Sequence, residues 1–353
     1  MQWPAHGANP LRLYEALQMV PPKRYIDFSV NTNPYPLPEA VIPTQAEFYE
    51  WVCQYPDPDG MKLILTLAER EGVQRSQLLL GNGASECIYL LAQWLENRRV
   101  GIFEPTFSEY RRACELYGCS IHSFHAVKEN GWLYELNEVK PILPTLDALF
   151  LCHPNNPTGT IWPKETLQQL LMLAREESVF VIVDEAFYDF WLDGFSVVDW
   201  LDDYPNVIVL RSLTKMYHLA GARLGYVVAH ENVIAELKKR KPPWSVNTIA
   251  QQLALRLLSL SSFVDETKRA IASERQRVIS ELRKLGYDVS PSVTNFYLLG
   301  DETKTLFYAF LRQGLIPRHT FNFPGLAGNY LRFAVRTKEE NDELLSFLRR
   351  WSR

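Results

Sequence analysis

The chain has 353 residues, of which 47% are hydrophobic and 22% charged, as is usual for a globular enzyme. Lysine and arginine number 37 against 41 acidic residues, so the net charge is −4, which argues against nucleic acid or an anionic membrane as a partner. The five cysteines are scattered without a CxxC pair, which argues against a zinc site and a disulfide framework, and we expect no metal.

The length exceeds what one core usually supports, so we expect a large and a small domain. The first residues lack the pattern of a signal peptide, and no apolar run reaches the length that spans a membrane. These features predict a cytoplasmic protein with no membrane partner.

The N-terminal part begins with an arm that contains His6 and Gly7, followed by a helix from Asn9 or Pro10 to Leu17. Residues 26–38 are rich in asparagine and proline, which predicts an irregular loop whose backbone can approach a ligand at Asn31. The spacing of apolar residues then predicts a helix over 61–71.

The segment Leu78–Leu80 predicts a strand, and the glycine turn after it leads into a helix at Gly83, Ala84 and Ser85. Backbone amides at the start of a helix bind phosphate well, and a serine hydroxyl adds to them. Because the glycine spacing does not match GxGxxG, the turn does not indicate a dinucleotide site.

Strands and helices alternate in the next part of the chain, with strands expected at 100–103, 148–152 and 179–183 and helices at 107–117 and 165–176. This alternation predicts an α/β fold with a mostly parallel sheet, whose ligands bind at the carboxyl ends of the strands. Phe107, Asn156 and Asp184 lie at those ends.

Lys215 is the most informative residue, because it lies in a polar turn between two apolar runs, 207–210 and 224–229, both expected to be buried parallel strands. A desolvated lysine has a lowered pKa, and its free amine can bond to an aldehyde. With Ser212 and Arg223 nearby, the site suits a molecule that carries an aldehyde and a phosphate, which favours pyridoxal 5′-phosphate (PLP). A solvated loop lysine is the alternative.

Three residues at strand ends could hold the ring of such a cofactor. Asp184 can pair with a protonated pyridine nitrogen, Asn156 can donate to the phenolate oxygen, and Phe107 can stack on the ring. Each also has an ordinary structural explanation, namely a helix cap, a turn residue and a core residue. These three residues occur in the same α/β chain as Ser212, Lys215, Arg223 and the phosphate-binding turn. Such a combination favours a cofactor site over separate structural roles.

The C-terminal part predicts a small α+β domain that packs with the N-terminal arm. Helices are expected at 248–258, 263–285, 303–313 and 338–351, and strands at 295–299, 315–318 and 330–335. We therefore expect residues 1–50 to form the arm and part of the small domain, 51–244 the large PLP-binding domain, and 245–353 the small domain.

From end to end the chain resembles the fold-type I PLP enzymes of the aspartate aminotransferase superfamily, with specific matches at 154–159, 184–187 and 212–223. The resemblance implies a seven-stranded, mostly parallel sheet and a homodimer in which Tyr55 reaches the PLP phosphate of the neighbouring subunit. It implies that Lys215 carries the cofactor and that Arg332 binds an anion of the substrate. The residues implied in cofactor binding are Gly83, Ala84, Ser85, Phe107, Asn156, Asp184, Ser212, Thr214, Lys215 and Arg223.

A closer resemblance is to the L-threonine-O-3-phosphate decarboxylases of cobalamin biosynthesis. It rests on His6-Gly7 with Asn9, 27–29 with Asn31, 81–83, 184–187, 211–215 and 243–247. It implies a small phosphorylated amino acid as substrate, with His6, Gly7, Asn31, Asn156, Arg318 and Arg332 as candidate binding residues. Histidinol-phosphate aminotransferases have tyrosine where this chain has Phe187, a departure that counts against plain membership of that group.

The cofactor residues by themselves do not decide between decarboxylation and aminotransfer, because the anchoring of the substrate selects which bond at Cα breaks. Our hypothesis is that Arg318, Arg332 and Arg336, together with His6, hold the phosphate while the carboxylate lies out of the ring plane in a less polar place. The alternatives are histidinol-phosphate or related aminotransfer, a non-catalytic PLP-binding regulator, and a nucleotide-binding module without PLP.

Overall fold

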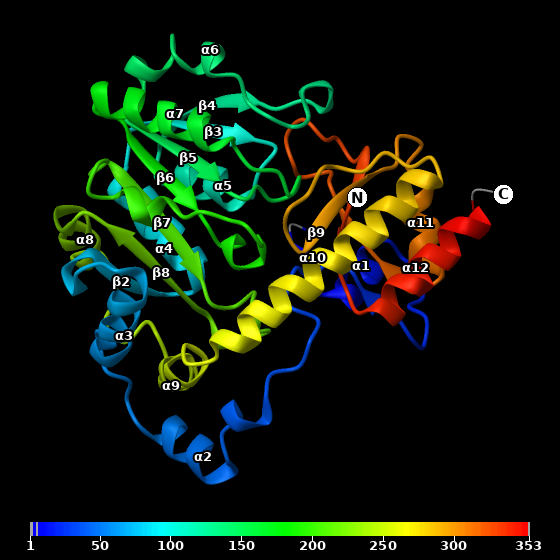
Figure 1. The fold of residues 1–353 in the computed structure, drawn as a ribbon, viewed down its shortest axis with the longest axis horizontal. Helices are drawn as coiled ribbons and strands as arrows, with labels where there is room; N and C mark the ends of the chain where they lie inside the picture. The colour runs from blue at the N-terminus through cyan, green and yellow to red at the C-terminus, as the bar shows by residue number, and fades with distance from the viewer. Residues whose placement is uncertain (1–2, 5, 352–353) are drawn as a thin grey trace.

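The computed structural model describes residues 3–4 and 6–351. Its larger part is built on a seven-stranded sheet (Figure 1). In spatial order the strands are β2 (Leu78–Asn82), β8 (Leu224–Ala229), β7 (Val207–Ser212), β6 (Phe180–Asp184), β5 (Ala148–Cys152), β3 (Arg99–Glu104) and β4 (Ser120–His125). The predicted seven-stranded, mostly parallel sheet is confirmed.

One prediction about strand direction is wrong. The five strands from β7 to β4 are parallel to one another, but β8 runs antiparallel to both of its neighbours, β7 and β2. The connection from Leu213 to Arg223 contains only a short 3-10 turn, at 220–222. A parallel return needs a crossover that is usually a dozen or more residues long and helical, so this short link brings the chain back antiparallel.

The large sheet is buried on both faces, which is why its central strands are continuous apolar runs. Side chains alternate along each strand: Ile182 and Ile208 join the core that includes α4, α5 and α8, whereas Val183 and Val209 join the core that includes α7. The helices of this part are α3 (Met61–Glu71), α4 (Gly83–Trp94), α5 (Glu109–Leu116), α6 (Leu136–Val139), α7 (Lys164–Glu176) and α8 (Glu231–Lys238). Because β7, β6, β5 and β3 are parallel, their buried runs end at one common edge of the sheet.

The smaller part contains an antiparallel sheet of order β11 (Arg318–His319), β12 (Tyr330–Ala334) and β9 (Phe296–Gly300). Its helices are α1 (Pro10–Ala16), α10 (Ser261–Lys284), α11 (Thr305–Arg312) and α12 (Lys338–Trp351). β1 (Ile26–Asp27) pairs in parallel with β10 (Leu315–Ile316), so the N-terminal segment lies beside the C-terminal part of the chain. In Figure 1 the long helix α10 extends from this part toward the large sheet.

The strand expected at 315–318 is divided between two sheets. β10 pairs with β1, whereas β11 pairs with β12, and Pro317 stands between them. Proline has no backbone N–H to donate to a ladder, which explains why neither sheet continues through this residue.

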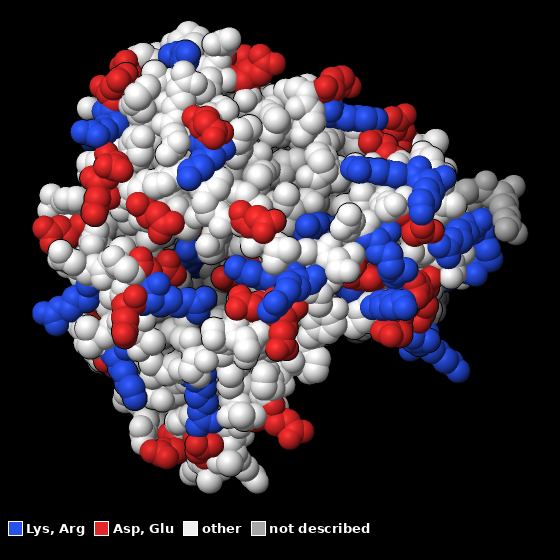
Figure 2. Space-filling model, viewed as in Figure 1, with Lys and Arg blue, Asp and Glu red and all other residues white. Residues whose placement is uncertain are grey.

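α2 (Gln45–Cys53) packs on α9 (Thr248–Leu257), where Arg256 forms an ion pair with Glu47 at 2.5 Å. Acidic and basic side chains are interspersed over the face shown in Figure 2. Within the described ranges, no helix has the length and apolar character to cross a membrane, and no three His, Cys, Asp or Glu side chains form a group suited to a metal ion.

Candidate active site

A cavity lies where the carboxyl ends of β5, β6 and β7 meet α4 and the turn after β7. Its lining consists of Ala84, Ser85, Ile88, Phe107, Tyr110, Cys152, Asn156, Asp184, Ala186, Phe187, Ser212, Thr214, Lys215 and Arg223. The structure thus brings together most of the residues that the sequence singled out for the cofactor. Three of them, Asp184, Ser212 and Lys215, end or follow neighbouring strands, which is why the parallel sheet places them together.

Lys215 is held in this cavity as a desolvated amine. Burial, with further contributions from the nearby guanidinium groups of Arg332 and Arg223, lowers the pKa of Lys215 from its ordinary 10.5 to about 8. The Lys215 carbonyl oxygen accepts a hydrogen bond from the Asn33 N–H at 2.9 Å, so the asparagine-rich loop fixes the turn that carries the lysine. A substantial fraction of the amine is therefore neutral and nucleophilic near pH 8.

This lowered pKa gives a testable pH dependence. When the cofactor-free protein is mixed with pyridoxal, the rate constant of covalent addition should rise with pH and reach its plateau through a midpoint near pH 8, because only the neutral amine attacks. The growth of visible absorbance between pH 6 and 10 measures it. A rate constant that is still climbing at pH 10 would show that Lys215 titrates as an ordinary lysine.

Asp184 is a buried carboxylate that accepts two hydrogen bonds, from the Tyr110 hydroxyl at 2.6 Å and from the Ala186 N–H at 2.9 Å. Burial raises the pKa of Asp184, against the lowering effect of these bonds and of Lys215. Among the described residues it forms no salt bridge, so an ionised Asp184 calls for a cationic partner in the cavity. A protonated pyridine nitrogen meets that requirement.

Tyr110 is a site residue that the sequence reasoning missed. It is fully buried, it stacks on Phe150 with ring centroids 5.2 Å apart, and its hydroxyl holds Asp184. Its position three residues after Phe107 in the helix expected at 107–117 was a usable signal, since residues at i and i+3 of a helix lie on the same face; in the structure the helix begins two residues later, at Glu109.

The start of α4 and Arg223 form a cradle suited to a phosphate. A Cβ on Gly83 would lie 2.5 Å from Arg223 Nη2, and a Cβ on Gly225 would lie 2.4 Å from the Ala84 nitrogen, so glycine is required for both close approaches. The hydroxyl groups of Ser212 and Thr214 are 2.9 Å apart beside it. Helix N–H groups, hydroxyl groups and a guanidinium are the donors that a phosphate monoester needs. The donor set therefore fits PLP.

Arg332 and Arg318 form a pair of guanidinium groups on the side of the small domain. They are directly opposite one another across the β11–β12 ladder, and residues in such positions project from the same face of a sheet. Arg332 donates to Asn156 Oδ1 at 2.6 Å and to the Ser29 carbonyl oxygen at 2.8 Å. Burial and Arg318 lower the pKa of Arg332 to about 9, and burial lowers the pKa of Arg318 to about 10. An anion bound here would relieve this unfavourable burial of charge.

Arg336 does not join this pair. Its Nε and Nη2 donate to Glu340 of α12 at 3.1 and 3.0 Å. The clamp expected from three arginines is thus reduced to Arg318 and Arg332.

The remaining candidates lie outside the cavity lining. His6 Nε2 lies 3.0 Å from Glu109 Oε1 in α5, and Gly7 is close to Ser29, where an added Cβ would be 2.8 Å from the Ser29 hydroxyl oxygen. Asn31 is buried, and neither polar atom of its side chain has a hydrogen-bond partner among the described residues. Tyr55 is 87% exposed on its own chain, with its ring 5.8 Å from that of Trp244.

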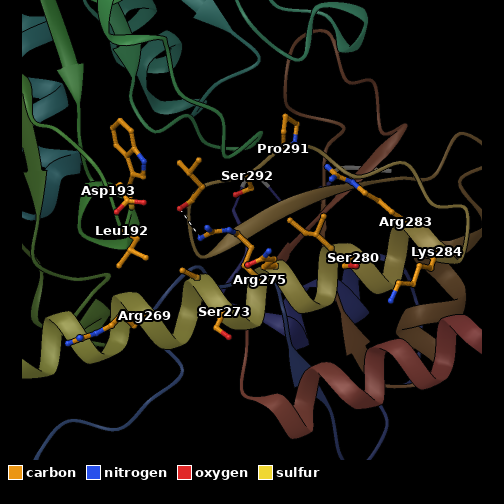
Figure 3. Close-up of a pocket in the computed structure, with 15 residues that line it drawn as sticks. Leu192, Asp193, Arg269, Ser273, Arg275, Ser280, Arg283, Lys284, Pro291 and Ser292 are labelled. Atoms are coloured by element: carbon orange, nitrogen blue, oxygen red, sulfur yellow. Dashed lines mark hydrogen bonds between the residues drawn. The ribbon is translucent and has the colours of Figure 1, made fainter.

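A second cavity, of about 1090 Å³, lies along α10 (Figure 3). The basic residues in its lining are Arg269, Arg275, Arg283 and Lys284. Arg275 donates to the carbonyl oxygens of Val293 at 2.8 Å and Thr294 at 3.0 Å, and thereby ties the loop after α10 to the helix. None of the residues proposed for the active site lines this cavity, so its size does not make it the site of chemistry.

Comparisons with known proteins show the family to which the chain belongs. The description "Aminotransferase class I and II" belongs to the family that matches residues 23–348. A threonine-phosphate decarboxylase of Salmonella typhimurium is 35% identical over 349 residues, which cover 98% of this chain and 96% of the relative. A histidinol-phosphate aminotransferase of Thermoanaerobacter pseudethanolicus is 33% identical over 339 residues and 93% of each chain.

Among solved structures, the histidinol-phosphate aminotransferase from Clostridium acetobutylicum is similar with a TM-score of 0.86 and 27% identity, covering 92% of this chain and 98% of that one. The match extends over both the large sheet and the smaller part of the chain. The chain therefore belongs to the class I and II aminotransferase family of fold-type I enzymes, and its cofactor is pyridoxal 5′-phosphate.

Proposed function

We propose that this enzyme decarboxylates L-threonine O-3-phosphate to (R)-1-amino-2-propanol O-2-phosphate in cobalamin biosynthesis. The observation that carries the proposal is the pair of buried arginines, Arg318 and Arg332, placed opposite one another on the β11–β12 ladder, with Arg332 bonded to Asn156 of the cofactor cavity. Two adjacent cations suit the dianionic phosphate of such a substrate. The decarboxylase from Salmonella typhimurium, which spans nearly the whole chain, supports the same assignment.

In this proposal each cavity residue has one task toward the cofactor. Asp184 pairs with the pyridine nitrogen, Phe107 stacks on the ring, and the phosphate is held by Ser212, Thr214 and Arg223 with the start of α4, from Gly83 to Ser85. Because Asn156 Oδ1 is occupied by Arg332, its Nδ2 is left to donate to the phenolate oxygen. When bound, PLP supplies the electron sink that stabilises negative charge at the substrate's Cα.

Lys215 handles the proton in either reaction. In aminotransfer its neutral amine removes the proton from Cα, whereas in decarboxylation its ammonium form returns one proton to Cα after CO2 has left. The choice between the two depends on which substituent of Cα is positioned for cleavage. We assign that positioning to the anion anchors, Arg318 and Arg332, with His6, Gly7 and Asn31 as further contacts of the substrate at the arm and the asparagine-rich loop.

The test of the function is an incubation of the PLP-loaded enzyme with threonine O-3-phosphate and no keto acid. We expect stoichiometric release of CO2 and multiple turnovers. Turnover that requires 2-oxoglutarate, without release of CO2, would instead assign the enzyme to the histidinol-phosphate or related aminotransferases.

This second function deserves the same assay because relatives such as that of Thermoanaerobacter pseudethanolicus are almost as similar, at 33% identity. Histidinol phosphate also carries a phosphate, so the arginine pair is compatible with both substrates. Phe187, which cannot donate a hydrogen bond to the phenolate oxygen, favours the decarboxylase.

The arginine anchors lead to a prediction for the Michaelis constant. Arg332→Ala and Arg318→Ala should each raise KM for threonine O-3-phosphate by roughly 10- to 100-fold, since a charge-assisted hydrogen bond is worth about 1.5–3 kcal/mol. Arg336→Ala is the matched control, because its guanidinium pairs with Glu340, and it should leave KM within about threefold. An unchanged KM in both Arg332→Ala and Arg318→Ala would remove the anchor from the proposal.

We also propose a homodimer with shared active sites. α2 buries none of its residues in the single chain, and aromatic and aliphatic side chains are exposed at Phe48, Tyr49, Val52 and Tyr55. The family resemblance implies that Tyr55 of a second copy covering this surface reaches the neighbouring cofactor phosphate. Sedimentation of the purified enzyme at micromolar concentration tests the dimer, and a monomeric mass would contradict it.

A further inference from the structure

Two phenylalanine rings form an apolar contact between the large and the small part of the chain at the active site. Phe187 follows β6 and lines the cofactor cavity, and Phe296 is the first residue of β9. The rings meet edge to face with centroids 4.8 Å apart at 79°. Phe296 is fully buried behind Phe187, which keeps only 5% of its surface exposed. We call these two rings the phenyl wall.

The proposed proton carrier lies near one ring of the phenyl wall, and the proposed anion anchor lies near the other. Lys215 Nζ is 6.0 Å from the centre of the Phe187 ring, and Arg332 Cζ is 5.5 Å from the centre of the Phe296 ring. Neither ring has a hydrogen-bonding atom. A substrate group directed against the wall would therefore lose water on that side and gain no hydrogen bond in exchange.

Such a surface acts differently on the two possible reactions. An ionised carboxylate is destabilised in apolar surroundings, and that penalty disappears when it leaves as neutral CO2. In the balanced step, the bond between Cα and the carboxylate carbon breaks, its electron pair stays on Cα, CO2 departs, and the Lys215 ammonium returns one proton to Cα. Removal of the Cα proton would leave the carboxylate in place and its penalty unrelieved.

We propose that Phe187, supported by Phe296, determines reaction specificity by forming the apolar surface against which the substrate carboxylate lies. The proposal rests on the proposed function and deepens it, because it names the less polar place that the carboxylate occupies. In this assignment Arg318 and Arg332 orient the substrate by its phosphate, and Phe187 supplies the surface that receives its carboxylate.

The experiment compares Phe187→Tyr with Phe187→Leu. The tyrosine adds one hydroxyl to the wall, and we expect the ratio of CO2 released to keto product formed from threonine O-3-phosphate, with a keto acid present, to fall at least tenfold. A hydroxyl that contacted only the phenolate oxygen of the cofactor would act alike on the two ligands compared by calorimetry and would leave their affinity ratio unchanged. The leucine keeps the wall apolar and should keep decarboxylation as the main reaction. Tyr188→Phe is the matched control, since its ring lies between Arg211 and Lys268 on the other side of the same segment, and it should leave the ratio unchanged.

A binding measurement that needs no turnover separates this proposal from the proposed function. In a PLP-loaded Lys215→Ala background, calorimetry compares threonine O-3-phosphate with 1-amino-2-propanol O-2-phosphate, which lacks the carboxylate. Phe187→Tyr should strengthen binding of the carboxylate-bearing compound relative to the other by about fivefold or more.

If the enzyme releases no CO2, the proposed function is wrong. The binding comparison alone then tests whether the substrate carboxylate lies against the phenyl wall. An unchanged binding ratio in Phe187→Tyr, in a protein whose melting temperature shows it to be folded, overturns the wall. An unchanged product ratio in an enzyme that does release CO2 overturns it as well.

Discussion

Replacing Lys215 with alanine should lower kcat by at least about 10³-fold, because one change removes both the covalent attachment of the cofactor and the group that moves the Cα proton. The variant should still bind PLP through the phosphate cradle and Asp184, but borohydride treatment should attach no cofactor to the protein. Turnover assays and mass measurement of the borohydride-treated protein follow the two losses separately.

Lys268→Ala is the control for this change. Lys268 lies on α10 with its ammonium 5.3 Å from the ring of Tyr188, outside the cofactor cavity, so its loss should leave kcat and cofactor attachment unchanged. Attachment of PLP to another lysine in Lys215→Ala, with activity retained, would contradict the role assigned to Lys215.

Asp184→Asn should act in opposite directions on activity and on the stability of the cofactor-free protein. With PLP bound, loss of the charge that faces the pyridine nitrogen should lower kcat by roughly 10²- to 10³-fold, since breaking a buried charge pair costs about 3–5 kcal/mol. Turnover at saturating substrate and PLP measures this loss.

Without cofactor, Asp184→Asn should stabilise the protein instead of impairing it. Burial raises the pKa of Asp184, so near neutral pH its ionised form is destabilised in the fold relative to the neutral form. The isosteric amide can keep both hydrogen bonds, by accepting from Ala186 and donating to the Tyr110 oxygen. The melting temperature of the cofactor-free variant should therefore exceed that of the wild type at pH 7, and the difference should shrink as pH falls and the wild-type carboxylate takes up its proton.

Asp189→Asn serves as the matched control. Asp189 lies five residues along the same segment, 4.0 Å from Arg70 and outside the cofactor cavity, so it should leave kcat within about threefold. A kcat of Asp184→Asn that is also within threefold of wild type would remove Asp184 from the catalytic machinery.

The arrangement of the cofactor cavity followed closely from the sequence. Asp184, Ser212 and Lys215 each end or follow a buried apolar run, and parallel strands that end at one edge must bring such residues together. The apolar runs and their alternation with helices predicted the mostly parallel sheet, and three short motifs indicated the family, whose resemblance implied seven strands. These features are local, because the periodicity of hydrophobic residues and the presence of turn residues can be recognised within a few consecutive positions.

Contacts between distant segments could not be predicted from such local patterns. The antiparallel direction of β8, the division of 315–318 between two sheets, and the hydrogen bond from Tyr110 to Asp184 each depend on which segments meet in space. The same holds for Arg336, which the sequence grouped with two other arginines and the fold directs to Glu340.

The sequence by itself determined which residues we propose to hold PLP and the strand ends at which they lie, because these depend on the pattern within each segment. Only the tertiary structure decided that Arg318 stands opposite Arg332 and that Phe187 meets Phe296, since strand register and the packing of the two parts fix these pairs. The residues proposed for the cofactor thus follow from local sequence, whereas the residue pairs proposed to surround the substrate follow from how the two parts of the chain pack on one another.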